Sequence, residues 1–207
     1  MSIAHEERAG IQEIQIHSIP KGKDYLLTLA VPYNEIGIIC RVTSVLFLHG
    51  WDIIEANAET SKDGYVRDAF LIRGRSDRQM DFDSLEEIRL DLNQLFYGGL
   101  SVMKYFEDKT NPQMFQNFEP CLKKTVRIYN PDSNDVTVID VRAKDRPGLL
   151  FQISEILFLS GIDILSFSAR SEDGEIRDTF LVRKENGAKI VEEDIIETLK
   201  AGILEAL

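Results

Sequence analysis

The chain contains the same sequence pattern twice. Residues 34–73 align with residues 145–183 across one single-residue gap near Lys62, and 15 of the 39 aligned positions are identical. Unrelated sequences of ordinary composition would share about two or three identities over this length. Two copies of this size are too long and too few for a solenoid array, so the repeat predicts two similar globular domains.

The second copy has the periodicities of a mixed α and β domain. Residues 135–143 alternate between apolar and polar side chains, which predicts a strand, and residues 149–160 carry apolar side chains at helical spacing. Two further alternating runs flank the Asp-Gly pair at 173–174, which suits the positive φ angles of a tight hairpin turn. In residues 191–207 apolar side chains recur at helical spacing, which predicts a final helix.

The first copy predicts the same order, with its Asp-Gly turn at 63–64 and a second helix striped by Leu85, Ile88 and Leu92. We expect residues 100–108 to add a closing strand. The result is β-α-β-β-α-β, the ferredoxin-like unit, in which both helices cover one face of a four-stranded antiparallel sheet. The predicted fold class is therefore α+β, with two such domains.

The second copy ends one strand short of this unit. Residues 124–130 are predicted to form a hairpin with residues 135–143 and so to supply the missing edge strand. Residues 11–20 have the same relation to the first copy, where they would extend the sheet. Because an exposed sheet edge tends to find a partner, we expect edge pairing between the two domains or between chains.

These patterns divide the chain into four segments. We expect a disordered N-terminus over residues 1–10, a first domain over 11–110, a linker over 111–123 and a second domain over 124–207.

Composition argues against several classes of protein. The 35 acidic and 24 basic residues give a formal net charge of -11, which disfavours nucleic acid as a partner. The apolar runs are too short to cross a membrane, and the start of the sequence lacks the pattern of a signal peptide. Cys40 and Cys121 lie too far apart to indicate a disulfide framework or a zinc site. We expect a cytoplasmic protein without metal or cofactor.

Catalytic motifs are lacking as well. None of His5, His17 and His49 has a neighbouring nucleophile or a metal-ligand spacing, so we expect no catalytic residues and no enzyme activity. The Arg-Asp pair at 177–178, which recurs at 67–68, places its two side chains on opposite faces of a strand. We therefore assign a structural role to Asp178, with hydrogen bonds from a loop. Trp51 is expected in the core or at an interface.

The junction between strand and helix in the second copy reads Asp145-Arg146-Pro147-Gly148. Proline suits the first turn of a helix, glycine allows close approach of a backbone or ligand, and Asp145 is placed to cap the helix. The remaining backbone N–H groups at the helix start would suit a carboxylate. Alternatively, Asp145 meets a ligand's ammonium and Arg146 its carboxylate, or the four residues only make a tight turn.

The segments DRPGLLFQISEIL and EIRDTFLV, on this order of elements, resemble the ACT family of small-molecule-sensing domains. The similarity is to the tandem ACT pair at the C-terminus of bacterial uridylyltransferase/uridylyl-removing enzymes and to plant ACT-repeat proteins. It covers roughly residues 11–207 and is strongest over 124–184. The resemblance implies that free amino acids or other small metabolites bind between paired units, which report nitrogen or amino-acid supply to an enzyme.

The first copy departs from this motif, because the loop there reads Asn34-Glu35-Ile36-Gly37 and reverses the charge of the arginine. We expect the loop at 145–149 to bind the carboxylate end of a ligand more tightly and the loop at 34–38 to be weaker or purely structural. The candidate ligand-binding residues are Asp145, Arg146, Pro147, Gly148, Leu149, Asn34, Glu35, Ile36, Gly37 and Ile38.

The first helix of each copy is apolar on more than its core side. Phe151 and Phe158 lie one heptad apart in the second copy, and Cys40 and Phe47 match them in the first. Such a helix is usually covered on more than one side, so we expect contact between the two domains or across the axis of a homodimer. A wide core-facing stripe is the alternative.

Together these features predict a non-catalytic regulatory protein. We expect it to bind an amino acid, by the resemblance glutamine, and to signal to a separate partner protein, because no nucleotidyltransferase portion is found in the 207 residues. The alternative is a ligand-free interaction module that docks a metabolic enzyme or regulator. An acylphosphatase-like enzyme is disfavoured because its loop, arginine and asparagine chemistry is not evident.

Overall fold

The computed structural model describes residues 14–31, 35–60, 66–110 and 123–207. The first half contains β1 (Gln15–Lys21), β2 (Asp24–Val31), α1 (Ile38–Leu48), β3 (Trp51–Thr60), β4 (Val66–Gly74), a short 3-10 turn (Arg75–Asp77), α2 (Phe82–Phe96) and α3 (Val102–Lys109). The second half contains β5 (Thr125–Tyr129), β6 (Thr137–Lys144), α4 (Leu149–Leu159), β7 (Ile162–Glu172), β8 (Glu175–Lys184) and α5 (Glu193–Ala206). The predicted N-terminal segment 1–10 and residues 111–122 of the predicted linker lie outside the described residues.

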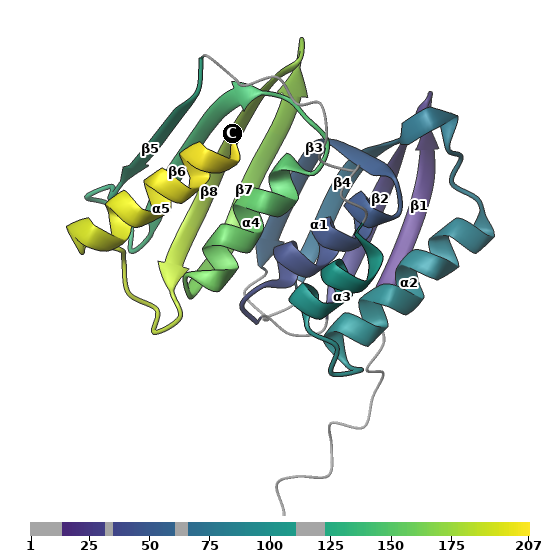
Figure 1. Ribbon diagram of the computed structural model, residues 1–207, viewed down its shortest axis with the longest axis horizontal. Coiled ribbons are helices and arrows are strands. Elements are labelled where there is room, and N and C mark those ends of the chain that lie inside the picture. The colour runs from purple at the N-terminus through teal and green to yellow at the C-terminus, as the bar shows by residue number, and fades with distance from the viewer. Residues whose placement is uncertain (1–13, 32–34, 61–65, 111–122) are drawn as a thin grey trace, which may run out of the picture.

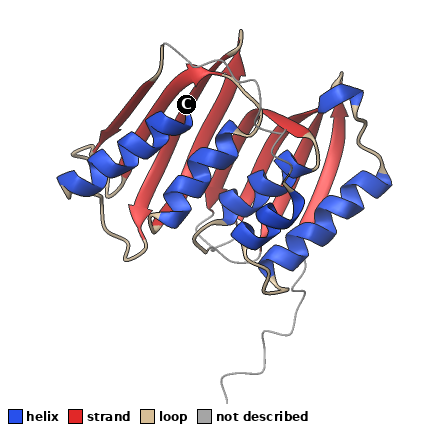
Figure 2. Ribbon diagram, viewed as in Figure 1, coloured by secondary structure: helices blue, strands red, loops and turns tan. Residues whose placement is uncertain are grey.

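The described strands form one antiparallel sheet of eight strands in the order β1-β2-β4-β3-β7-β8-β6-β5. The helices lie together on one face of this sheet (Figures 1 and 2). The predicted α+β class, with antiparallel pairing and helices on one face, is confirmed. Among the described residues, no helix combines the length and the hydrophobicity needed to span a membrane.

The first half differs from the prediction in the segment at residues 100–108. The expected closing strand at residues 100–108 is wrong, because this segment forms helix α3. Ser101 accepts a hydrogen bond from the N–H of Lys104 at the helix start, and Val102 and Tyr105, three positions apart, are buried on one side. The alternation that suggested a strand is therefore one face of a short helix.

The edge position that a closing strand would take is occupied in both halves by a strand from upstream. β1 pairs with β2 from Gln15 to Lys21, and β5 pairs with β6 from Thr125 to Tyr129. The first half is therefore ββαββαα and lacks the predicted closing strand, whereas the second half is ββαββα, with residues 124–130 supplying the edge strand as predicted. The predicted hairpins before the first helix of each copy are confirmed.

The two halves join through an approximate two-fold axis. β3 and β7 pair antiparallel, and Asn57 lies opposite Ser168, its own equivalent in the sequence repeat. On the helical side the hydroxyls of Thr43 and Ser154, another equivalent pair, lie 3.0 Å apart where α1 meets α4. The expected edge pairing between domains is confirmed, and it has the self-complementary geometry of a symmetric dimer interface.

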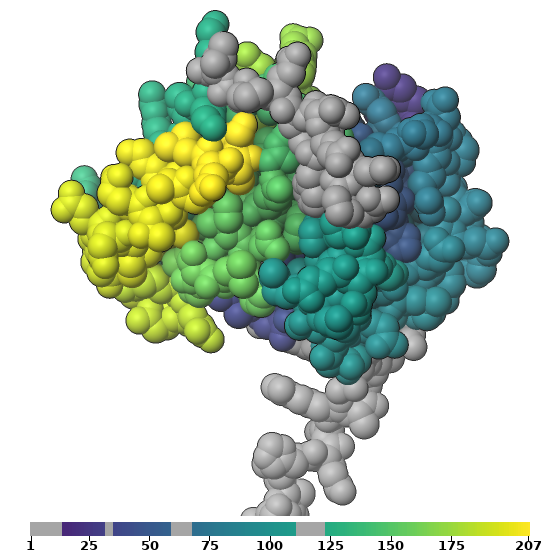
Figure 3. Space-filling model, viewed as in Figure 1, coloured from purple at the N-terminus to yellow at the C-terminus, as the bar shows by residue number. Residues whose placement is uncertain are grey.

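Aromatic rings fill the space between α1 and α4. The rings of Phe47 and Phe151 stack with centroids 6.4 Å apart, and Phe106 of α3 stacks on Phe151 at 4.6 Å. Figure 3 shows the surface of α3 lying against that of α4 on the helical face. The predicted contact between the apolar helices of the two domains is confirmed.

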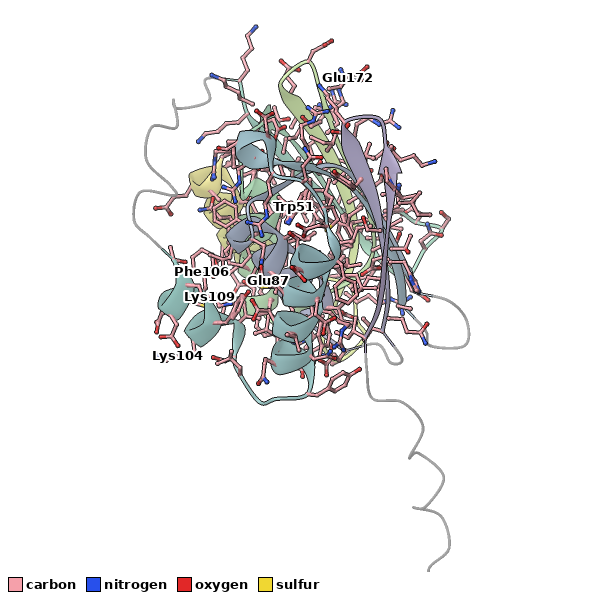
Figure 4. The ribbon with its side chains drawn as sticks, turned by 90° about the vertical axis from the view of Figure 1, so that its right-hand side faces the viewer. Trp51, Glu87, Lys104, Phe106, Lys109 and Glu172 are labelled. Atoms are coloured by element: carbon pink, nitrogen blue, oxygen red, sulfur yellow. The ribbon has the colours of Figure 1, made fainter. Side chains whose placement is uncertain are left out.

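A polar cluster fastens α3 to the rest of the first half. Asp91 of α2 accepts hydrogen bonds from His49 and from Tyr105, both at 2.7 Å, and it also pairs with Lys109. Burial would raise the pKa of Asp91, but these three hydrogen bonds outweigh it and lower that pKa. Figure 4 shows Lys109 on α3, with Glu87 on the neighbouring α2. α3 is thus held by charge as well as by apolar packing.

Candidate functional site

The loop before α4 is held by its backbone. The N–H of Asp145 donates to the carbonyl of Gly174 at 2.8 Å, which ties the loop to the β7–β8 hairpin. The loop ends at Gly148, whose φ of 77° lies in the left-handed region, and α4 begins at Leu149. Pro147 therefore precedes the helix, and the prediction that it lies in the first turn is wrong.

The predicted capping role of Asp145 is also wrong. α4 has no side-chain cap, and the carboxylate of Asp145 accepts a hydrogen bond from the hydroxyl of Ser171 on β7. The turn at Pro147 and Gly148 separates Asp145 from the helix start, so its side chain faces the hairpin instead. Asp145 therefore connects the loop to β7 instead of capping α4.

Glycine at the helix start is required by packing between the halves. A Cβ atom on Gly148 would lie 2.7 Å from Cε2 of Phe47, and one on Gly37 would lie 2.6 Å from Cδ2 of Phe158. Each helix start thus receives the phenylalanine of the other half. The close approach that the sequence predicted is made by a neighbouring ring.

A cavity of about 400 Å³ lies at the seam between the halves. Its walls are the loop before α4, the end of α1, the start of β3 and the β7–β8 hairpin. The charged and polar residues that line it are Thr43, Asp52, Arg73, Asp145, Arg146, Arg170, Ser171, Asp173 and Asp178. Its apolar lining includes Phe47, Trp51 and Phe151.

The equivalent position in the first half holds a cavity of only about 20 Å³. It is lined by Glu35, Gly37 and Ile38 from the loop before α1 and by Phe158 and the start of β7. The two cavities are related by the same approximate two-fold axis that relates the halves.

Asp178 is the most deeply buried carboxylate of the large cavity, with 4% of the residue exposed. Its Oδ1 accepts the backbone N–H of Arg170 at 3.3 Å. Burial raises the pKa of Asp178 to about 7, and the nearby charge of Asp145 acts in the same direction. We predicted a hydrogen bond from a loop, but the donor lies on the neighbouring strand β7.

Asp52 is the carboxylate that the first half contributes to the lining of this cavity. Burial raises the pKa of Asp52, Arg75 opposes this at 3.5 Å, and Asp145 raises it further. Arg75 also donates to the carbonyl of Phe47 at the end of α1. The charge of Asp52 is thus partly balanced from within its own half.

The arginines around the cavity have partners inside the protein. Arg73 is bound by both carboxylate oxygens of Asp24, at 2.6 and 2.9 Å. The guanidinium of Arg146 donates to the side chain of Gln152 and to the carbonyl of Ala206 near the end of α5. Burial lowers the pKa of Arg146. Arg146 thus ties the loop to two helices.

The first half makes the same kind of tie with different side chains. Glu35 pairs with Arg41 at 2.8 Å, and Arg41 also donates to the carbonyl of Ile36 at 3.3 Å. Arg41 is the equivalent of Gln152, and Glu35 is the equivalent of Arg146. The reversed charge that the sequence showed is therefore matched by a second replacement, one helical turn into the helix.

The candidate residues divide between the two cavities. Asp145, Arg146, Pro147, Gly148 and Leu149 all line the large one. Glu35, Gly37 and Ile38 line the small one, Ile36 contributes its carbonyl to Arg41, and Asn34 lies outside the described residues. Whether either set binds a ligand stays a prediction.

The sequence did not predict that residues of the first half line the large cavity. Trp51 and Asp52 stand at the start of β3, across the seam from the motif, and only pairing of the halves brings them to it. Asp178 was noted in the sequence as one of a recurring Arg-Asp pair but was given a structural role. The recurrence was the signal, but periodicity alone could not show that the side chain borders a cavity.

Comparison with known proteins identifies part of the chain. Residues 137–199 match the model of the ACT domain family. Bifunctional uridylyltransferase/uridylyl-removing enzyme from Cereibacter sphaeroides is 24% identical over 171 residues, covering 83% of this chain and 18% of the relative. The enzyme of the same name from Gluconobacter oxydans is 26% identical over 197 residues, covering 94% of this chain and 20% of the relative.

The chain thus spans about a fifth of the length of these curated relatives. Among solved structures, aspartate kinase from Synechocystis aligns with a TM-score of 0.44 and 14% identity, over 86% of this chain and 26% of that one. The second half of the chain therefore resembles the ACT domain family over residues 137–199, and most of the chain resembles a segment of bifunctional uridylyltransferase/uridylyl-removing enzymes.

Proposed function

We propose that this chain is a non-catalytic regulatory protein that binds a free amino acid at the seam between its halves and signals to a separate partner protein. The observation that carries the proposal is the cavity of about 400 Å³ beside the loop at 145–149. Its volume lies in the roughly 300–1,000 Å³ range of small-molecule sites, and apolar walls with a few convergent polar groups are typical of such sites.

The position of the cavity supports a regulatory role. Phe47, Trp51 and Asp52 come from the first half, and Asp145 and Asp178 from the second. A ligand held by both sets would favour one arrangement of the halves over others, because a ligand shifts a conformational equilibrium by its difference in affinity for the two states. An output to a separate protein would then follow from that shift.

A thermal-shift panel of the twenty standard amino acids, with the chiral ones as L-enantiomers, tests the proposal, and L-glutamine is the first candidate. A ligand at 100 times its dissociation constant adds about 2.7 kcal/mol to the stability of the folded state. The D-enantiomer of each stabilising amino acid, at the same concentration, controls for nonspecific effects. If no L-amino acid raises the melting temperature at millimolar concentration, the amino-acid sensor is ruled out.

That negative result would favour a docking module without a ligand. Exposed apolar side chains at the two edges of the sheet offer surfaces for it, since Ile19 on β1 is 54% exposed and Tyr129 on β5 is 47% exposed. A homodimer is part of the proposal. Light scattering on the purified chain, with and without the stabilising amino acid, measures the molecular mass and so shows whether the chain forms a dimer.

A further inference from the structure

Asp178 combines burial with incomplete hydrogen bonding. It is 4% exposed and lines the large cavity, and the one hydrogen bond recorded for it among the described residues, from the N–H of Arg170, goes to Oδ1. Within the described part of the chain, Oδ2 receives no donor. Oδ2 is not one of the fully buried side-chain oxygens without a partner, so it keeps accessible surface, and Asp178 lines the cavity. A carboxylate oxygen in this position is stabilised when a positively charged donor arrives.

The surroundings of Asp178 do not supply that donor. The titratable and charged groups that line the same cavity are Asp52 on β3, Arg73 on β4, Asp145 and Arg146 in the loop, Arg170 on β7 and Asp173 in the hairpin turn. Arg73 is bound by Asp24, Arg170 pairs with Glu55 at 2.9 Å, and Arg146 turns to Gln152 and the end of α5. The balance around Asp178 is therefore acidic.

We propose that Asp178, with Asp145 beside it, binds the ammonium group of the ligand. This inference rests on the proposed function and deepens it, because it sets the orientation of the amino acid in the cavity. An ammonium offers three donors and a compact positive charge, which suits two carboxylates on neighbouring elements. The carboxylate of the ligand then lies away from Asp178, towards the rest of the cavity.

Proton linkage follows from this arrangement. Burial raises the pKa of Asp178 to about 7, so the side chain is largely protonated at pH 6 and largely ionised at pH 8. An ammonium binds the ionised form, and apparent affinity scales with the fraction of protein in the competent state. The affinity is therefore expected to rise about tenfold from pH 6 to pH 8, with release of a proton on binding.

The chain offers a matched control for Asp178. Asp68 occupies the equivalent position in the first half, is 2% exposed, and burial raises the pKa of Asp68 to about 7. Asp68 is not among the residues that line the large cavity. The variants Asp178→Asn and Asp68→Asn thus change the same kind of buried carboxyl, with and without contact to the proposed ligand.

Calorimetric titrations at pH 6 and pH 8 test the proposal with two kinds of probe. The first is the amino acid with the largest thermal shift, and the second is n-butylammonium chloride, with sodium butyrate as the probe that lacks an ammonium. Asp178→Asn is expected to lose at least tenfold in affinity for both ammonium probes at pH 8 and to lose the pH dependence. Asp68→Asn is expected to bind both as the unmodified chain does, and butyrate is not expected to depend on either residue.

The outcomes separate the two proposals. Equal affinity of an amino acid for Asp178→Asn and the unmodified chain would overturn the role of Asp178 and leave the sensor standing. If n-butylammonium binds through Asp178 but no amino acid binds, the role of Asp178 would stand and the amino-acid sensor would be overturned. Absence of binding by every probe would overturn both.

A measurement on the unmodified chain guards against misfolding of the variant. The carboxyl carbon of Asp178 can be followed by NMR through a pH titration, and saturating n-butylammonium is expected to lower its midpoint. An unchanged midpoint would contradict the proposal. Asp145→Asn gives a second variant, for which weaker ammonium binding is expected.

Discussion

The two cavities beside the starts of α1 and α4 occupy equivalent positions in one repeat, yet one measures about 400 Å³ and the other about 20 Å³. Both lie beside a helix start with a glycine, and both face the start of a strand from the other half. The difference lies in the side chains. The backbone is repeated in the two halves, and their different side chains leave a large cavity at one position and a small one at the other.

The loop ties illustrate this divergence. In the first half Glu35 and Arg41 close on each other, and the guanidinium of Arg41 lies 6.0 Å from the ring centre of Phe158 beside the small cavity. In the second half Arg146 points to α5. Four aspartates therefore line the large cavity, whereas Asp163 and the ion-paired Glu35 are the carboxylates that line the small one among the described residues.

The two phenylalanines that pack against the helix-start glycines differ in how deeply they are buried. Phe47 is 2% exposed and stacks with Phe106 of α3 and with Phe151, whereas Phe158 is only partly buried. The reason is α3, which covers α1. We therefore expect equivalent substitutions in the two halves to differ in their effect, and three pairs of variants can sharpen or break the comparison.

The largest effect is expected from truncating the buried rings. Phe47→Ala removes a ring packed from both sides and should lower the free energy of unfolding by about 3–5 kcal/mol. Phe158→Ala removes a partly exposed ring and should cost less than half as much. Urea unfolding of both variants measures the difference. Equal losses would contradict the claim that α3 makes the two positions unequal.

A smaller effect is expected at the helix-start glycines. Gly148→Ala places a Cβ against the confined ring of Phe47 at a residue with positive φ, and should destabilise by about 2 kcal/mol. Gly37→Ala meets Phe158, which has room to move, and should cost less. Denaturation of both variants by urea tests this order. In a double variant, Phe47→Leu should recover part of the loss from Gly148→Ala, and no recovery would show that backbone strain alone is responsible.

The smallest effect is a slope of stability with pH. Because the folded pKa values of Asp178 and Asp68 are both raised to about 7, each group stabilises the folded state at low pH and loses that stabilisation as pH rises towards 7. One such group contributes at most about 1.4 kcal/mol per pH unit. Unfolding of Asp178→Asn and Asp68→Asn at pH 6 and pH 7 should each show a shallower fall in stability between the two pH values than the unmodified chain. An unchanged slope in either variant would mean that its aspartate does not keep its proton when folded.

Much of the fold was accessible from the sequence because it depends on local pattern. Alternation and helical spacing located strands and helices in both copies, and the Asp-Gly pair at 173–174 marked a hairpin that the structure contains. The prediction for 100–108 failed because nine residues fit either period, and β1 pairs with β2 at the sheet edge where the closing strand was expected. Short amphipathic segments take the conformation that the available surface allows.

The candidate site was accessible only in part. The loop at 145–149 was found from its residue types, and all five of its members line the large cavity. Asp52 and Trp51 were not, because they are more than 90 positions away in sequence and carry no motif of their own. Asp178 was seen, but its burial beside empty space depends on atoms contributed by two strands and a loop.

The sequence by itself determined that the chain has two related halves, that each is an α+β unit, and that a loop with a charged residue and a glycine precedes the core of the first helix in each half. These properties follow from periodicity, turn chemistry and internal similarity, which act over a few neighbouring residues. Only the tertiary structure decided that the halves share one sheet, that each glycine receives a ring from the other half, and that one of two equivalent loops borders a large cavity. Those outcomes depend on side-chain volumes and charges meeting across the seam, and no local pattern records them.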